Sequence, residues 1–117
     1  MIKKIAILFA GTWILVSSCH NDKEELLNPG GINCVGVNAR FAVDVNPIIQ
    51  SRCATAGCHA AGSTNGPGPL TTYDQIRDAA NRIKPAVVSR IMPKGSTLST
   101  EEIKLINCWI ESGAPNN

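Results

Sequence analysis

Aromatic side chains are scarce in this chain of 117 residues, which has two Trp, two Phe and one Tyr. Phe9 and Trp13 lie close to the first residue, so the rest of the sequence holds only Phe41, Tyr73 and Trp109. Aromatic residues bury the largest areas in protein cores, and a core with so few of them is thin. A buried cofactor with a large apolar surface would provide the missing centre.

The sequence also lacks several patterns that define common classes of protein. No segment alternates apolar and polar residues over the length of a strand, and no internal repeat is present. We find no nucleophile beside a base, no pair of carboxylates within a motif and no phosphate-binding loop, so we do not expect an enzyme. These absences favour an all-α domain of short helices and loops.

The first 18 residues have the pattern of an export signal. Lys3 and Lys4 form a short basic region, residues 5–16 are apolar, and small residues lead to Cys19. The apolar run is shorter than the roughly 20 residues that span a bilayer, which makes a retained membrane helix the weaker interpretation. The string V-S-S-C resembles a bacterial lipobox, which implies a lipoprotein signal peptide at 1–18 and a lipid on Cys19. The alternative is an ordinary cleaved signal in which Cys19 is incidental.

Removing this signal changes the charge balance. Lys and Arg number 11 and Asp and Glu number 9 in the whole sequence, and Lys3 and Lys4 leave with the signal. The remaining chain therefore has nine residues of each sign and is formally neutral. A nucleic-acid partner would need a basic patch, so we expect none.

The rest of the chain divides into a tether and one small domain. Residues 19–33 are mostly polar and contain Asn28, Pro29, Gly30 and Gly31, which is typical of a flexible tether. Residues 34–117 then form the folded unit. We expect a first helix that ends just before Cys53, followed by a loop over 60–69. A second helix over 73–82 would be capped by Thr72, and a short helix would start at Pro85. The last helix would begin with a capping box formed by Ser99 and Glu102.

The segment Cys53-Ala54-Thr55-Ala56-Gly57-Cys58-His59 is the strongest chemical signal. Covalent haem attachment uses two thiols that bond to the haem vinyl groups and an adjoining histidine that ligates the iron, usually as C-x-x-C-H. The spacer here has four residues instead of two. Gly57 can adopt a positive φ, and the alanines are small, so a bulged loop can take up the extra length.

Beyond the signal the chain has one methionine, Met92, within I-M-P-K-G. Pro93 favours an extended backbone at Met92, and Gly95 permits a turn, so a loop would present the thioether. Methionine opposite a histidine raises the reduction potential of haem iron and fills its sixth position, which favours electron transfer. The alternative is that Met92 fills a gap in the core.

Residues 41–114 resemble the class I, or mitochondrial-type, cytochrome c domain found in small exported bacterial lipoproteins. The order of elements carries the resemblance, with the pieces V-N-P-I-I-Q-S-R-C, L-T-T-Y-D, I-M-P-K-G and W-I-E-S-G-A. It implies a small cytochrome c-like fold of three to five short helices around one covalently bound haem c. The resemblance implies that Cys53 and Cys58 form the thioether bonds and that His59 and Met92 bind the iron. It also implies that the carbonyl of Pro69, or else that of Pro67, accepts a hydrogen bond from the His59 ring. Leu70 and Trp109 would line the haem pocket or pack near it.

Cys34 and Cys108 remain after these assignments. In an exported protein, two remaining cysteines favour a disulfide, and the alternative is a pair of buried free thiols.

Two rival readings use the same cysteines. A zinc site could use Cys53, Cys58, His59 and a further thiol, although adjacent Cys and His side chains rarely reach one tetrahedral ion. A disulfide-stapled lipoprotein interaction module with Cys53 bonded to Cys58 would explain the even cysteine count but not His59 or Met92.

The sequence as a whole predicts a monohaem c-type cytochrome that carries single electrons. The expected protein is exported, lipid-anchored to a bacterial membrane through Cys19, monomeric, and exposed to the periplasm or the cell surface. Its partners would be redox proteins of the cell envelope. An iron that Met92 does not bind would instead allow gas-binding or peroxidase-like chemistry.

Overall fold

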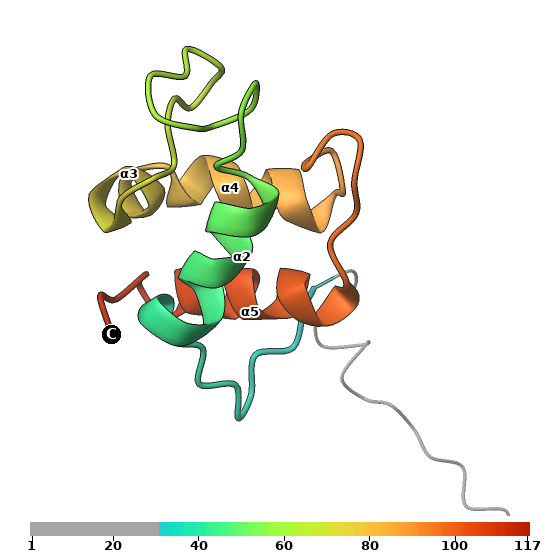
Figure 1. Ribbon diagram of the computed structural model, residues 1–117. Coiled ribbons are helices and arrows are strands. Elements are labelled where there is room, and N and C mark those ends of the chain that lie inside the picture. Colours follow the sequence, from blue (N-terminus) through green and yellow to red (C-terminus); the bar gives the residue numbers. More distant parts are fainter. Residues whose placement is uncertain (1–30) are drawn as a thin grey trace, which may run out of the picture.

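The computed structural model describes residues 31–117, and the predictions for the signal peptide, for Cys19 and for residues 19–30 of the tether lie outside that range. Within it the secondary structure is helical and contains no strand. The elements are a π-helical turn η1 (Phe41–Val45) and the helices α2 (Asn46–Arg52), α3 (Tyr73–Asp78), α4 (Ala80–Val88) and α5 (Thr100–Glu111), arranged as Figure 1 shows. The predicted small all-α fold of short helices is confirmed.

The turn η1 leads directly into α2, which ends where the cysteine segment begins. Phe41, Val45 and Ile49 recur every four residues and are buried, which places one apolar stripe along both elements. The start of η1 is closed by the Asp44 carboxylate, which accepts the N–H of Arg40 at 2.8 Å. The helix predicted to run up to Cys53 is therefore present.

Helices α3 and α4 follow each other with a break at Ala79. Thr72 and Gln75 form a capping box at the start of α3, as predicted for Thr72. The predicted helix start at Pro85 is wrong, because α4 runs through this residue. Proline lacks an N–H and so removes one helical hydrogen bond. Ile83 and Val87 on either side of it are both buried, however, and their packing keeps the helix continuous.

Helix α5 begins at the predicted capping box. The Ser99 hydroxyl accepts the N–H of Glu102 at 3.1 Å, and the Glu102 carboxylate accepts the N–H of Ser99 at 2.7 Å. Ile103, Ile106 and Trp109 on its inner face are buried and form an apolar stripe. None of the helices in residues 31–117 is both long enough and apolar enough to cross a membrane.

The core lies where α5 packs against η1 and α4. Phe41 stands at its centre, with its ring centroid 5.0 Å from that of Tyr73 and 5.5 Å from that of Trp109. The Trp109 indole N–H donates to the carbonyl of Pro115 at 2.9 Å, so its polar end is satisfied. The three aromatic residues of the domain are thus grouped in one cluster.

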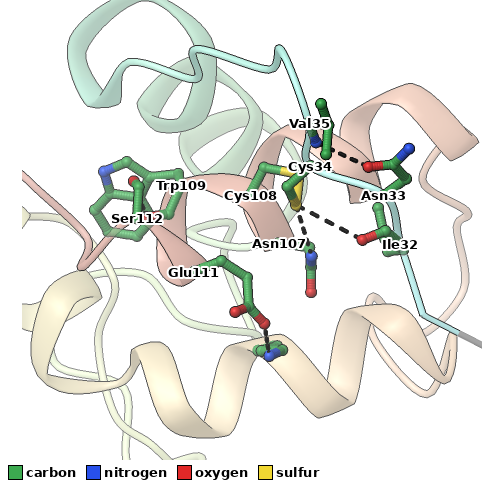
Figure 2. Close-up of a disulfide and its surroundings, with 10 residues drawn as sticks. Ile32, Asn33, Cys34, Val35, Asn107, Cys108, Trp109, Glu111 and Ser112 are labelled. Atoms are coloured by element: carbon green, nitrogen blue, oxygen red, sulfur yellow. Dashed lines mark hydrogen bonds and ion pairs between the residues drawn. A yellow bond between two sulfur atoms is a disulfide. The ribbon is translucent and has the colours of Figure 1, made fainter. Parts of the chain in front are cut away.

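A disulfide joins Cys34 to Cys108 across 74 residues of sequence. Figure 2 shows the bond between the segment that precedes η1 and the last turn of α5, with the Asn107 amide donating to the Cys34 sulfur at 3.4 Å. This is the predicted pairing. It fastens the beginning of the folded unit to its last helix.

Candidate functional site

The chain leaves α2 at Arg52 and closes a tight loop before His59. The Cys53 N–H donates to the Ile49 carbonyl at 2.9 Å, and the Cys53 carbonyl accepts the N–H of His59 at 3.0 Å. Gly57 has a φ of 79° and open space around it, so it is needed for its backbone conformation. The four-residue spacer therefore bulges outward without separating Cys53 from His59.

The His59 ring is buried, and its orientation is fixed by one hydrogen bond. Nδ1 lies 2.9 Å from the carbonyl oxygen of Gly68. Because a carbonyl oxygen only accepts, Nδ1 carries the proton and Nε2 keeps the lone pair that can bind a metal ion. The His59 carbonyl also accepts the Leu70 N–H at 2.9 Å, so ring and backbone are both tied to the loop that follows.

The acceptor for His59 differs from the prediction. We expected the carbonyl of Pro69, or else that of Pro67, whereas the acceptor is Gly68 between them. Gly68 has a φ of 103°, which turns the chain in a way that a proline, with φ fixed near about −65°, cannot. The kind of partner is as predicted, a carbonyl of the loop that orients the His59 ring, but the residue is not.

Two adjoining hollows meet at His59 and share four lining residues. The first, which we call the apolar hollow, has a volume of about 200 Å³, and the second, the loop hollow, about 460 Å³. Both are bordered by Cys53, His59, Gly66 and Met92. The loop hollow lies within the range of about 300–1,000 Å³ that is typical of small-molecule and cofactor sites, and the apolar hollow that adjoins it is smaller.

The remaining walls come from separate parts of the chain. The other residues of the apolar hollow are Ile49, Pro67, Leu70, Arg82, Ile83, Ala86, Val87 and Ile91. The loop hollow adds Gly57, Cys58, Asn65, Pro93 and Lys94. Of the predicted site residues, Cys53, Cys58, His59, Leu70 and Met92 are therefore brought together, and Pro69 is not part of either lining.

Met92 reaches the hollows from the loop between α4 and α5, as its sequence context predicts. Its N–H donates to the Ala86 carbonyl at 3.1 Å, which ties this point of the loop to α4. Its side chain is half-buried and borders both hollows. His59 and Met92 thus approach one space from segments that are 33 positions apart in the sequence.

Cys53 and Cys58 are free thiols in this structure. Burial of Cys53 raises the pKa of its thiol to about 11, with a further contribution from the neighbouring Cys58. Cys53 therefore carries its proton at neutral pH. The Cys53–Cys58 bond expected for a stapled module is therefore not formed, and any staple in the described residues is the Cys34–Cys108 bond.

The donor set does not favour zinc. Residues 31–117 contain no group of three or more His, Cys, Asp and Glu side chains placed to hold a metal ion. A structural zinc site needs four such ligands. One histidine and one methionine on a shared hollow, with thiols beside them, fit haem iron better.

The charges around the hollows are of one sign. Arg82 and Lys94 line them, and no acidic residue of the described chain does so. The Arg82 guanidinium lies so close to Gly66 that a Cβ there would come within 2.8 Å of Nη2. An arginine at the edge of an apolar hollow, with no ion pair among residues 31–117, can bind a carboxylate of a ligand.

Sequence reasoning missed most of the α4 wall. Ile83 and Val87 are four residues apart, which is the spacing of one buried helix face. This signal was overlooked because a helix was expected to start at Pro85, between the two residues. Nothing in the sequence distinguishes Arg82 from a solvated charge. Trp109, expected in or near the pocket, lines neither hollow and belongs to the aromatic cluster of the core.

A scan against protein-family models found no matching family, and searches of the curated proteins and of the solved structures found no match either.

Proposed function

We propose that this protein is a monohaem c-type cytochrome that carries single electrons between redox proteins in the envelope of a bacterium. The observation that supports this most is the meeting of Cys53, Cys58, His59 and Met92 around two adjoining hollows. The first three come from one loop, and Met92 comes from another loop. No single local pattern in the sequence requires that they meet.

Each of these residues has a defined role in the proposal. Cys53 and Cys58 would hold the haem through thioether bonds, and Nε2 of His59 and the sulfur of Met92 would bind its iron. When bound, haem supplies an iron that changes reversibly between two oxidation states one electron apart. The polypeptide supplies the rest: an imidazole oriented by Gly68 and apolar walls that limit contact with water.

Arg82, whose guanidinium lies beside Gly66 at the hollows, adds support. Haem carries two carboxylates, and burying a carboxylate without a partner is costly. Arg82 forms no ion pair with the described chain and borders the apolar hollow, so it is free to pair with one of them. The walls thus combine thiols, possible iron ligands and a cation, the three kinds of group that haem c would use.

The proposal includes the cellular setting expected from the sequence. The protein would be exported, held at a membrane by a lipid on Cys19, and active as a monomeric carrier, not an enzyme. If His59 and Met92 both bind the iron, no position on it would be left for a substrate. Docking with partners would then use the surface around the hollows, where Ile91 is 65% exposed.

The direct test is a stain for covalently bound haem on the denatured protein, produced in a host that attaches haem to exported proteins. We expect a positive stain and a red protein with a sharp alpha band on reduction. Cys53→Ala and Cys58→Ala would each keep the stain if both thiols are joined, whereas loss of the stain in only one variant assigns a single bond. A wild-type protein without covalent haem contradicts the proposal.

The ligands are tested by separate variants. His59→Ala should abolish proper haem incorporation. Met92→Leu keeps the volume of the side chain and removes the sulfur, so it should lower the reduction potential and let carbon monoxide bind to the reduced protein. An unchanged potential and spectrum in Met92→Leu would remove Met92 from the iron.

A haem-free, disulfide-stapled interaction module is the second candidate, and the Cys34–Cys108 bond is the observation that fits it. This bond is equally suited to a haem protein, so it does not separate the two. The colour of the purified protein does, because a module of this kind is colourless.

A further inference from the structure

The loop that carries Met92 has few polar contacts with the rest of the domain. Within residues 91–97, the hydrogen bond from the Met92 N–H to the Ala86 carbonyl is the one that the described structure contains. Ile91 is 65% exposed and is not held in the core. A segment with so few contacts opens at low free-energy cost unless its ends are fixed.

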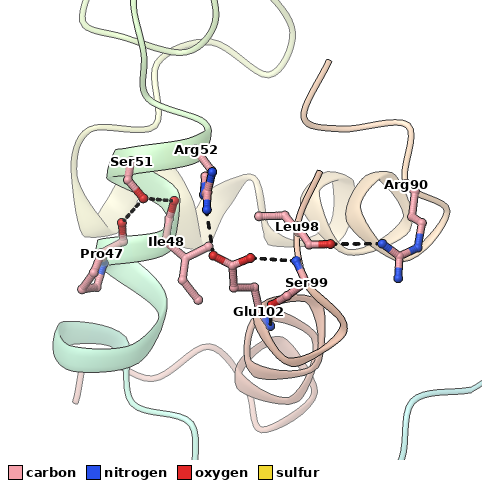
Figure 3. A network of polar contacts seen from close by, with 8 residues as sticks. All are labelled: Pro47, Ile48, Ser51, Arg52, Arg90, Leu98, Ser99 and Glu102. Carbon is pink, nitrogen blue, oxygen red and sulfur yellow. Dashed lines mark hydrogen bonds and ion pairs between the residues drawn. The ribbon is translucent and has the colours of Figure 1, made fainter. Parts of the chain in front are cut away.

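Arg90 connects the two ends of this loop. Its Nη1 donates to the carbonyl of Leu98 at 3.1 Å, and its Nη2 lies 3.5 Å from the Thr100 hydroxyl. These two acceptors flank Ser99, the N-cap of α5. Figure 3 shows the Arg90 side chain reaching from the end of α4 to the Leu98 carbonyl.

The acceptor side of this contact is rigid. Leu98 is 3% exposed, and the capping box between Ser99 and Glu102 fixes the start of α5. The second carboxylate oxygen of Glu102 lies 3.6 Å from Nε of Arg52, the residue before Cys53 (Figure 3). Arg90 therefore fastens the loop to a network that extends to the thiol-bearing segment.

The backbone of Arg90 indicates that its position is specific. Its φ is 60°, in the left-handed region that non-glycine residues rarely adopt. A residue in this conformation is retained where the surrounding contacts determine it. Here the conformation lies at the point where the chain leaves α4 and enters the Met92 loop.

We infer that Arg90 is a positioning residue that clamps the Met92 loop closed and so keeps the Met92 sulfur at the shared hollows. The consequence for the iron rests on the proposed function, whereas the clamp itself does not. In the wild-type protein the loop stays in place when a competing ligand approaches. Without the guanidinium it is held by the Met92 N–H and by burial of Leu98.

The test compares Arg90→Met and Arg90→Gly with the wild-type protein, using the full holoprotein. Both variants lose the clamp, and the glycine variant also removes the unfavourable φ. Arg77→Met is the matched control, because Arg77 is an exposed arginine on α3 that pairs with Asp74 and Asp78 and lines neither hollow.

Two measurements are made on each protein. Exchange of the Met92 amide, the one hydrogen-bonded amide in residues 91–98, should be about tenfold faster in both Arg90 variants, the factor expected for loss of one hydrogen bond from a charged donor. Carbon monoxide should bind the reduced holoprotein about tenfold more readily for the same reason. The control should match the wild type in both.

Unchanged exchange of the Met92 amide in both Arg90 variants would overturn the clamp, whatever cofactor the protein holds. Faster exchange in Arg90→Met alone would also overturn it, because backbone conformation would then be the cause. A wild-type protein without covalent haem would overturn the proposed function instead, and the exchange measurement would still decide the clamp.

Discussion

Replacing both bridged cysteines with alanine, Cys34→Ala with Cys108→Ala, should destabilise the domain strongly. The bond closes a loop across 74 residues, and the chain-entropy model gives about 4 kcal/mol for a loop of this length. Cys108 is 4% exposed, so the smaller side chain leaves a gap that costs roughly a further 1 kcal/mol. A cofactor attached near the middle of that loop would already restrict the unfolded chain and lower the first figure.

The expected net loss is about 4 kcal/mol, which corresponds to a fall in melting temperature of about 20 °C for a domain of this size. Urea unfolding followed by circular dichroism measures it. The single variant Cys34→Ala is the control, because it removes the bond and keeps the buried sulfur at 108. The difference between the two variants therefore isolates the gap.

A loss below about 1 kcal/mol in the double variant would refute this reasoning. It would mean that the unfolded chain gains little freedom, or that residues 31–40 detach while η1, α4 and α5 stay packed. Amide exchange distinguishes these results, because detachment exposes the segment before η1 and leaves α5 protected.

Two further predictions concern titratable groups. Because burial raises the pKa of Cys53 to about 11, in protein produced without haem its alkylation at pH 8 should be about a hundredfold slower than that of an ordinary exposed thiol. The alkylation rate should rise about tenfold per pH unit. Mass spectrometry of the two cysteine peptides measures both rates, and equal rates at Cys53 and Cys58 would contradict the prediction. The hydrogen bond from the Ser99 N–H holds the pKa of Glu102 below its usual value, so its carboxylate stabilises the folded state above its unfolded pKa and loses this effect as the pH falls. Glu102→Gln should therefore be less stable than the wild type at pH 7, and its stability should approach that of the wild type in acid. Urea unfolding at several pH values tests this. A stability difference that does not depend on pH would show that the charge of Glu102 contributes nothing.

Local signals in the sequence predict most of the helices. The capping boxes at Thr72 and Ser99 lie within four residues of the groups that they bond, so the sequence alone identifies both helix starts. The passage of α4 through Pro85 is different. Local rules end a helix before a proline, and only the packing of Ile83 and Val87 against the core overrides them.

The candidate site divides in the same way. Cys53, Cys58 and His59 are neighbours in the sequence, and Met92 is the one methionine beyond the signal, so these residues could be named without a structure. The carbonyl acceptor of His59 depends on the φ of Gly68 and could not be chosen among neighbouring residues. Arg82 could not be found either, because its contact with the hollow depends on tertiary packing.

The hydrogen bond between the Cys53 carbonyl and the His59 N–H has a consequence for evolution. It joins the residues on either side of the loop, while residues 55 and 56 at its tip are exposed. Insertions at such a tip are tolerated, because they extend into solvent and cost little loop entropy. Spacer length in this segment is therefore open to drift, and descendants of one ancestor can differ in it while they keep the same arrangement of thiol and imidazole.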